Sequence, residues 1–180
     1  MGMEKFSFTT RLLHWTIAAF LLIQIPLAWY MIDLPLGPDK FAKYGLHKSF
    51  GAVLFTLAVT RLVWAIIGNR PPLPPETKRY EKILAKATQG LLYLLVIIMP
   101  VSGWVMSSAA NVPVTIFGVI ALPNLVEPNE QLMDIMKNVH EMQSIVLLIL
   151  VSLHFVAGLK HHFVDRNNVL HSMLPFVKKR

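Results

Sequence analysis

The sequence lacks cysteine and holds few charged residues, and each shortage narrows the kind of protein that it encodes. None of the 180 residues is cysteine, which excludes disulfides, thiolate metal sites, iron–sulfur clusters and covalently attached c-type haem. Only 15% of the residues are charged, whereas a soluble domain carries about 25%. The deficit indicates that lipid is the main solvent of this chain.

The net charge of +7 would suggest nucleic acid as a partner if the protein were soluble. Here the basic residues lie between apolar stretches and at the C-terminus, where lipid headgroups and membrane topology explain them better. We therefore expect membrane lipid and no nucleic acid as partners. We expect no cleavable signal peptide, because the first apolar stretch is too long and no small-residue cleavage pattern follows it.

Four apolar stretches reach the roughly 20 residues that a membrane-spanning helix needs. They lie at 11–32, 46–67, 88–108 and 139–162, so we predict an all-α fold, a membrane four-helix bundle formed by one domain over 1–180. Pro26 and Pro100 are expected to bend the first and third helices. The apolar segment at 112–122 is too short to span and contains Pro113 and Gly118, so we expect it at the membrane surface.

The charged residues of the connections predict the orientation of the bundle. Basic residues crowd the second connection and the regions near both termini, and acidic residues gather in the first and third connections. The positive-inside rule then places both termini and the second connection in the cytoplasm. The proline-rich residues 71–75 are expected to form a stiff extended linker on that side.

Four of the seven histidines fall at two depths of the predicted bundle. His14 and His154 lie toward the cytoplasmic side, and His47 and His140 lie near the periplasmic side. His140 and His154 are separated by nearly four helical turns, so they project from one face about 21 Å apart. Ionisable residues within a membrane are costly and are usually functional. Two pairs at two depths are what two stacked haems require as axial iron ligands.

A small residue follows each of these four histidines at the fourth position, where it lies above the ligand on the same helix face and leaves room for a flat macrocycle. These residues are Ala18, Gly51, Ser144 and Gly158. For any single histidine near a helix end, an interfacial or capping role is the simpler interpretation. The joint pairing at two depths is what favours ligation.

Zinc is the alternative metal, but a zinc site needs three or four ligands at one level. The sequence His140-Glu141 is also not followed by a second histidine four residues later, so the zinc metalloprotease pattern is absent. Two axial histidines would leave an iron with no open position, which favours electron transfer over oxygen binding. We predict no catalytic side chain.

Two further residues are candidates for binding near the cytoplasmic pair. Arg61 follows His47 by 14 residues, which places it at the depth of His14 and His154. Its guanidinium can bind a haem propionate or a quinone oxygen, or it can extend to the interface. His161 projects from nearly the same face as His154. It can handle protons at a quinone headgroup, and contact with anionic lipid explains it equally well.

These motifs resemble the bacterial cytochrome b561 family, which is related to the cytochrome b subunits of nickel–iron hydrogenases. The matching segments are RLLHW at 11–15, LHKSFG at 46–51, TRLVW at 60–64 with the prolines of 71–75, HE at 140–141, LH at 153–154, KHHF at 160–163 and 170–175. The resemblance covers nearly the whole chain. It implies a multi-pass protein of the bacterial inner membrane with two haem b groups, bound by His14 with His154 and by His47 with His140.

The resemblance also implies quinone-linked electron transfer, and some relatives oxidise superoxide at the periplasmic face and reduce ubiquinone. The chain departs from the family at Gln89, four residues before Tyr93, where members often carry a further histidine. An oxidoreductase of this kind would use Lys40, Lys43 and Lys48 to steer a small anion.

Two other functions compete with this one. The first is an electron conduit or membrane anchor for a partner dehydrogenase or hydrogenase. The second is a small proton or ion transporter, which predicts no haem and for which the membrane-buried carboxylates are lacking.

Overall fold

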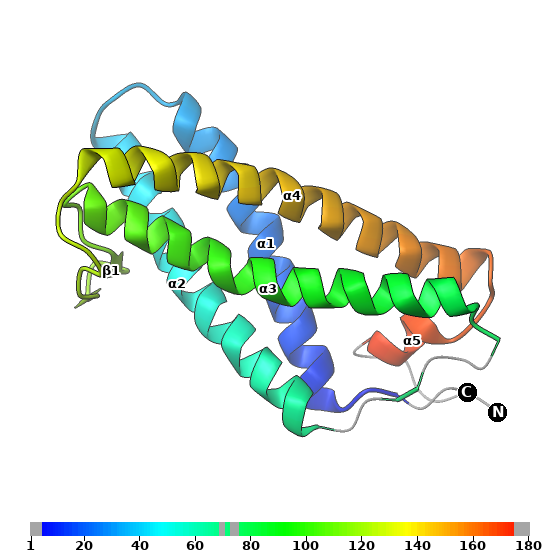
Figure 1. The fold of residues 1–180 in the computed structure, drawn as a ribbon. Coiled ribbons are helices and arrows are strands. Elements are labelled where there is room, and N and C mark those ends of the chain that lie inside the picture. Colours follow the sequence, from blue (N-terminus) through cyan, green and yellow to red (C-terminus); the bar gives the residue numbers. More distant parts are fainter. Residues whose placement is uncertain (1–4, 69–70, 73–75, 175–180) are drawn as a thin grey trace.

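The described residues form four long helices, one short helix and a two-stranded hairpin. The computed structural model describes residues 5–68, 71–72 and 76–174 (Figure 1). The elements in chain order are α1 (Phe8–Asp33), α2 (Pro38–Ile67), α3 (Arg79–Ala109), β1 (Thr115–Ile116), β2 (Ile120–Ala121), α4 (Glu130–Phe163) and α5 (Val169–Met173). The four long helices, α1 to α4, are each long and apolar enough to cross a membrane. The predicted all-α fold with four spans is therefore confirmed.

Three of the long helices begin well before the predicted spans. α2 begins at Pro38, α3 at Arg79 and α4 at Glu130, because helical hydrogen bonding continues into polar residues that a count of apolar residues leaves out. Proline suits the first turn of α2, since its missing N–H would have no partner there. The Asn129 side chain caps α4 by accepting a hydrogen bond from Leu132 N–H at 2.9 Å.

The two prolines that were expected to bend helices, Pro26 and Pro100, both lie inside helices, in α1 and α3. Residues 73–75 of the predicted extended linker lie outside the described residues.

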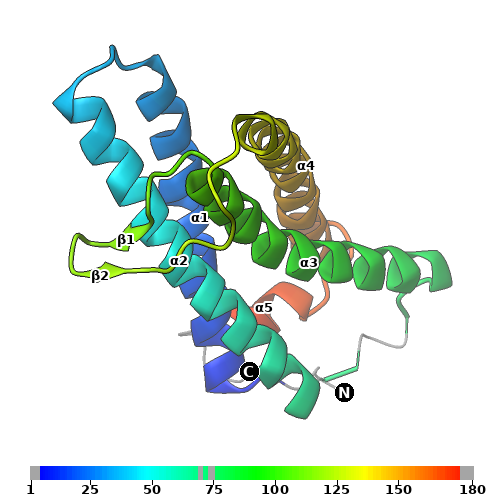
Figure 2. The same ribbon diagram turned by 60° about the vertical axis from the view of Figure 1, so that its left-hand side comes forward.

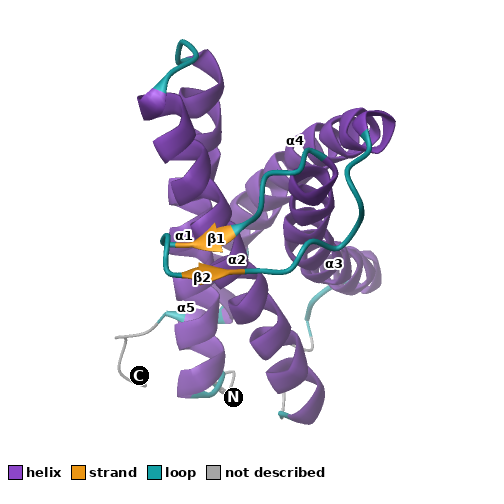
Figure 3. Cartoon of the chain, turned by 90° about the vertical axis from the view of Figure 1, so that its left-hand side faces the viewer, coloured by secondary structure: helices purple, strands orange, loops and turns teal. Residues whose placement is uncertain are grey.

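The long helices pack in chain order. α1 packs on α2, α2 on α3 and α3 on α4, and within the described residues α4 has no comparable backbone packing with α1 or α2. Figures 2 and 3 show the α1–α2 hairpin and the α3–α4 hairpin as two crossing pairs. α1 begins and α4 ends at the same end of the bundle (Figure 1). Side chains rather than close helix packing must therefore connect α4 to the first hairpin.

A single apolar layer occupies the middle of the bundle. Its buried residues come from all four long helices and are Ile17, Leu21, Leu54, Ala58, Leu95, Val96 and Leu147. Leu147 is only 2% exposed and lies midway between His140 and His154 on α4. Many other large apolar side chains are exposed on the outside of the bundle, such as Leu22 at 75%. In a membrane these outer side chains face lipid. The buried layer, which lies between His140 and His154, separates the two levels of histidines.

The segment at 112–122, which was expected at the membrane surface, contains a two-stranded β-hairpin. β1 and β2 are antiparallel, with Thr115 opposite Ala121. The turn has positive φ at Phe117 (48°) and Gly118 (72°), and Val119 N–H donates to Ile116 O at 3.0 Å. These are the features of the primed turns that suit hairpins. The sequence prediction missed the strands because each has only two residues.

Ser49 attaches this hairpin to α2, two residues beyond His47. Its hydroxyl oxygen accepts a hydrogen bond from Phe117 N–H at 2.9 Å, and its one proton can be donated to Gly45 O of its own helix at 2.8 Å or to Thr115 O of the hairpin at 3.1 Å. Ser49 is 1% exposed, so water does not compete for these bonds. One buried hydroxyl therefore fixes the hairpin against the start of the second span.

We predict that Ser49→Ala frees the hairpin, because it removes the acceptor of the Phe117 N–H. The expected loss of stability is about 0.5–1.5 kcal/mol, the net value of one hydrogen bond. It should appear as a lower thermal midpoint in detergent and as faster protease cleavage within 112–122. Thr56→Ala is the matched control, since the Thr56 hydroxyl bonds only to Ala52 O of its own helix. Equal cleavage rates in the two variants would contradict the assignment of Ser49 as the attachment point.

Candidate functional site

The four candidate ligands form two facing pairs of imidazoles. The ring centroids of His14 and His154 are 6.0 Å apart, and those of His47 and His140 are 6.4 Å apart. A metal–imidazole bond is about 2.0 Å long and the ring centroid lies about 1.1 Å further, so imidazoles on opposite sides of one metal have centroids about 6.2 Å apart. Each pair therefore has the spacing that one shared metal ion requires.

The surroundings of the pairs favour a metal that brings its own equatorial ligands. Among the described residues, no group of three or more histidine, cysteine, aspartate or glutamate side chains is placed to hold a metal ion. A zinc site would need such a group. A porphyrin iron needs only two axial side chains, so the donor set fits haem.

His140 is held in the protonation form that a metal ligand needs. Its Nδ1 lies 3.1 Å from Met99 O and 3.1 Å from Ser102 Oγ. Because a backbone carbonyl can only accept, Nδ1 carries the proton and the Nε2 lone pair is left for a metal. Gly103 leaves room for this ring, since a Cβ at that position would lie 3.1 Å from His140 Cε1.

His47 has a buried nitrogen with no hydrogen-bond partner. Its Nδ1 and the Oε1 of Gln24 are both buried and unpaired, while Gln24 Nε2 donates to His47 O at 3.0 Å. An unpaired buried polar atom costs about 1–3 kcal/mol. Orphaned atoms beside a facing imidazole are typical of a site that a ligand completes.

Arg61 lies beside the cytoplasmic-side pair. Its Nη1 donates to His14 Nδ1 at 2.7 Å, and its Nε donates to the Tyr93 hydroxyl at 3.3 Å. Because arginine can only donate, His14 Nδ1 accepts and its proton lies on Nε2. Metal binding through Nε2 requires that Arg61 release His14. Its guanidinium would then be free to bind a carboxylate.

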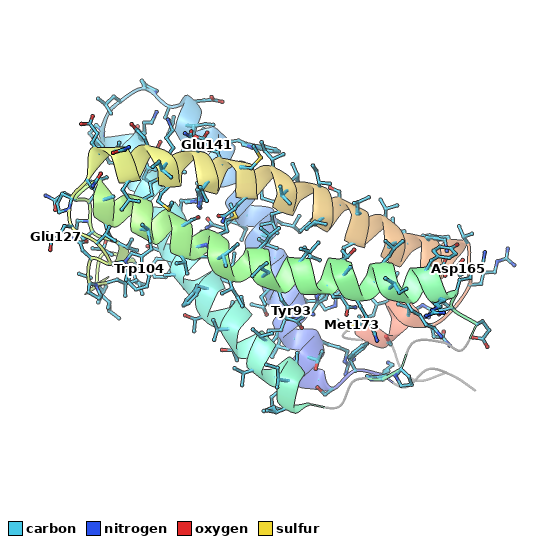
Figure 4. The ribbon with its side chains drawn as sticks, in the orientation of Figure 1. Tyr93, Trp104, Glu127, Glu141, Asp165 and Met173 are labelled. Carbon is cyan, nitrogen blue, oxygen red and sulfur yellow. The ribbon has the colours of Figure 1, made fainter. Side chains whose placement is uncertain are left out.

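His161 belongs to a cluster of charged groups at the end of α4. Its Nδ1 lies 2.9 Å from Asp165 Oδ2, and Lys160 Nζ binds both Asp165 and Glu81 at 2.8 Å. The hydrogen bond from Lys160 holds the pKa of the Asp165 carboxyl below its usual value. Figure 4 shows Asp165 at the opposite end of the bundle from Glu127. The cluster ties the end of α4 to the start of α3.

Among the described residues, His161 makes no hydrogen bond or ring contact with His14 or His154. Its role in quinone or proton chemistry stays a prediction. Gln89, at the position where the family often carries histidine, is exposed on α3.

Sequence reasoning did not identify four residues that surround the histidine pairs: Gln24, Ser102, Gly103 and Gln143. The two glutamines carried a usable signal, because polar side chains inside apolar spans are costly and need partners. Ser102 and Gly103 carried none, since small residues are common in membrane helices for packing alone.

Four membrane-spanning helices that present facing imidazoles define the class of membrane b-type cytochromes. The sequence model of the prokaryotic cytochrome b561 family matches residues 5–176, and the chain belongs to that family. Membership implies the binding of b-type haem. Together with the four apolar helices, it makes the chain a multi-pass protein of the bacterial inner membrane.

The chain is similar over nearly its whole length to several relatives. It is 27% identical to "Cytochrome b561 homolog 2" of Escherichia coli (strain K12), with 95% of this chain and 92% of the relative covered. It is 28% identical to "Probable superoxide oxidase CybB" of Yersinia pestis, with 98% of each chain covered. A third relative, "Cytochrome b561 homolog 1" of Escherichia coli (strain K12), is 24% identical over 96% of this chain and 98% of the relative.

We predict that Gly103→Ala weakens haem binding at one of the two pairs, because the added methyl group forces the His140 ring to move by a few tenths of an ångström. The measurement is haem per chain in the purified protein, by the pyridine haemochrome spectrum. Gly90→Ala is the control, since a Cβ at that position on the same helix meets nothing within 4 Å. Equal haem content in the two variants would show that the ring does not depend on this glycine.

Proposed function

We propose that this protein transfers electrons across the inner membrane through two b-type haems and delivers them to a quinone. His14 and His154 would hold the haem on the cytoplasmic side, and His47 and His140 the haem on the periplasmic side. The observation that carries the proposal is the spacing of the two imidazole pairs, 6.0 and 6.4 Å between ring centroids. When bound, the haems would supply one-electron carriers at two depths.

The chain's own contribution is to set the separation and exclude water. α4 supplies one imidazole to each pair, so a single helix fixes the two levels about 21 Å apart along its axis. The buried layer around Leu147 fills the space between the levels. In the orientation that the loop charges favour, the His47–His140 pair lies toward the periplasm.

Superoxide is the donor that we propose at the periplasmic side. One relative, 28% identical over 98% of the chain, is named a probable superoxide oxidase. Oxidation of two superoxide anions gives two molecules of oxygen and two electrons, and a quinone takes up these electrons with two protons to become a quinol. The proposed quinone site is near Arg61, and His161 is the proposed proton-handling residue.

Two of the three lysines that were expected to steer an anion, Lys40 and Lys48, differ in their placement. Lys40 donates to Ile32 O at 2.9 Å and to Leu34 O at 2.8 Å, so its ammonium group caps the end of α1. Lys48 follows His47 directly and makes one long hydrogen bond, to Val112 O at 3.4 Å. Its charge is therefore better placed than that of Lys40 to attract an anion toward this pair.

Single replacement of the four histidines by alanine tests the ligand assignment. We expect each variant to lose one of two haems, because a haem that keeps a single imidazole is bound weakly. Haem per chain and the optical spectrum of the reduced protein are the measurements. His171→Ala serves as the control, since His171 makes an edge-to-face contact with His162 and, among the described residues, no ring contact with the four candidate ligands. Two haems retained in any of the four variants would remove that residue from the site.

Rapid mixing of the oxidised protein with superoxide tests the donor. We expect haem reduction that slows as salt rises, followed by reoxidation when quinone is added. Lys48→Gln should slow the reduction severalfold, because the steering charge is lost. Lys86→Gln, at the other end of the bundle, should leave the rate unchanged. If superoxide reduces no haem in the unmodified protein, this donor is excluded while electron transfer from another donor still stands.

A further inference from the structure

The hydrogen bonding around His140 extends beyond the imidazole itself. Ser102 Oγ lies 3.1 Å from His140 Nδ1, 2.7 Å from Gln143 Oε1 and 2.8 Å from Met99 O. Met99 and Ser102 belong to α3, and Gln143 lies nearly one turn after His140 on α4. Ser102 is 6% exposed. The network therefore joins two helices through a buried hydroxyl.

The number of protons fixes the direction of these bonds. Ser102 has one hydroxyl proton, and both Gln143 Oε1 and Met99 O can only accept. Ser102 must donate to one of these two oxygens, which leaves its lone pairs to face His140. His140 Nδ1 is therefore the donor toward Ser102, and the hydroxyl passes the polarisation on to an acceptor beyond it. In low-dielectric surroundings such chains strengthen each member bond.

The two imidazole pairs differ in the charge of the groups beside them. Oxygen acceptors draw on the Nδ1 proton of His140, which makes the ring a stronger electron donor to a bound metal. At the other pair, the positive guanidinium of Arg61 lies beside His14 and also donates to the Tyr93 hydroxyl at 3.3 Å, so its charge stays near the pair after it releases His14 Nδ1. A nearby positive charge favours the more reduced metal, and an electron-rich ligand favours the more oxidised one.

We propose that Ser102 and Gln143 are positioning residues for His140 that hold its Nδ1-protonated form and lower the reduction potential of the haem that it binds. This inference rests on the proposed function. It makes the periplasmic-side haem the easier one to oxidise. Electrons then move energetically downhill from the His47–His140 level to the His14–His154 level, in the direction from an external donor to quinone.

The test is a potentiometric titration of the holoprotein followed by its visible spectrum. We expect Ser102→Ala to raise the midpoint of one haem and to leave the other in place. We expect the midpoint to shift by at most about 59 mV, which for one electron is a tenfold change in the ratio of oxidised to reduced haem at fixed potential. Ser102→Thr, which keeps the hydroxyl, should restore the original midpoint.

Two further variants make the result specific. Ser107→Ala removes a hydroxyl that is 3% exposed on the same helix and donates to Val112 O, so it should move neither midpoint. Gln143→Leu removes the acceptor beyond Ser102 while keeping a similar volume. It should shift the same midpoint upward by a smaller amount. If Ser102→Ala does not fold, Gln143→Leu takes its place in the test.

The outcomes separate the two proposals. If the protein holds two haems and His140→Ala loses one, but Ser102→Ala and Gln143→Leu leave both midpoints in place or lower one, the positioning role is wrong and the proposed function stands. A shift in the Ser107→Ala control equal to that of Ser102→Ala would also overturn it. If the purified protein holds no haem at the His47–His140 pair, both proposals fail.

Discussion

The structure depends on one constraint: imidazoles on different helices must face each other at the distance of a shared metal. α4 does not pack closely on α1 or α2, yet it supplies a partner to a histidine of each. The imidazole pairs and the apolar layer around Leu147 thus relate α4 to the first hairpin, while α3 packs directly on α2. In a bilayer, where apolar side chains gain little by leaving lipid, such specific contacts matter more than burial does in water.

Much of this arrangement could be predicted from the sequence, because it follows from the helical period and from the lengths of the apolar stretches. The four spans follow from about 20 apolar residues each, and the pairing of His14 with His154 and of His47 with His140 follows from depth. The helix starts could not be predicted from hydropathy, since α2, α3 and α4 begin in polar residues. The hairpin around Gly118 was missed because a two-residue strand leaves no period to detect.

The small residues beside the histidines could not be predicted from the sequence for a different reason. Ser102 and Gly103 matter because α3 places them against a ring that is carried by α4, and nothing local to their sequence marks this contact. The partner of Arg61 was equally hidden. Depth placed this side chain near the cytoplasmic-side pair, but its bond to His14 Nδ1 comes from the lateral arrangement of α1 and α2, which depth does not determine.

The sharing of α4 between both pairs also bears on how this chain can vary. A substitution on the outer face of α4 between His140 and His154 changes only what lipid contacts. Insertion or deletion of one residue in the same segment would turn one imidazole by about 100° relative to the other and break one pair whichever end stays fixed. We therefore expect the spacing of fourteen residues to be kept, while the outward-facing residues between the two histidines can vary.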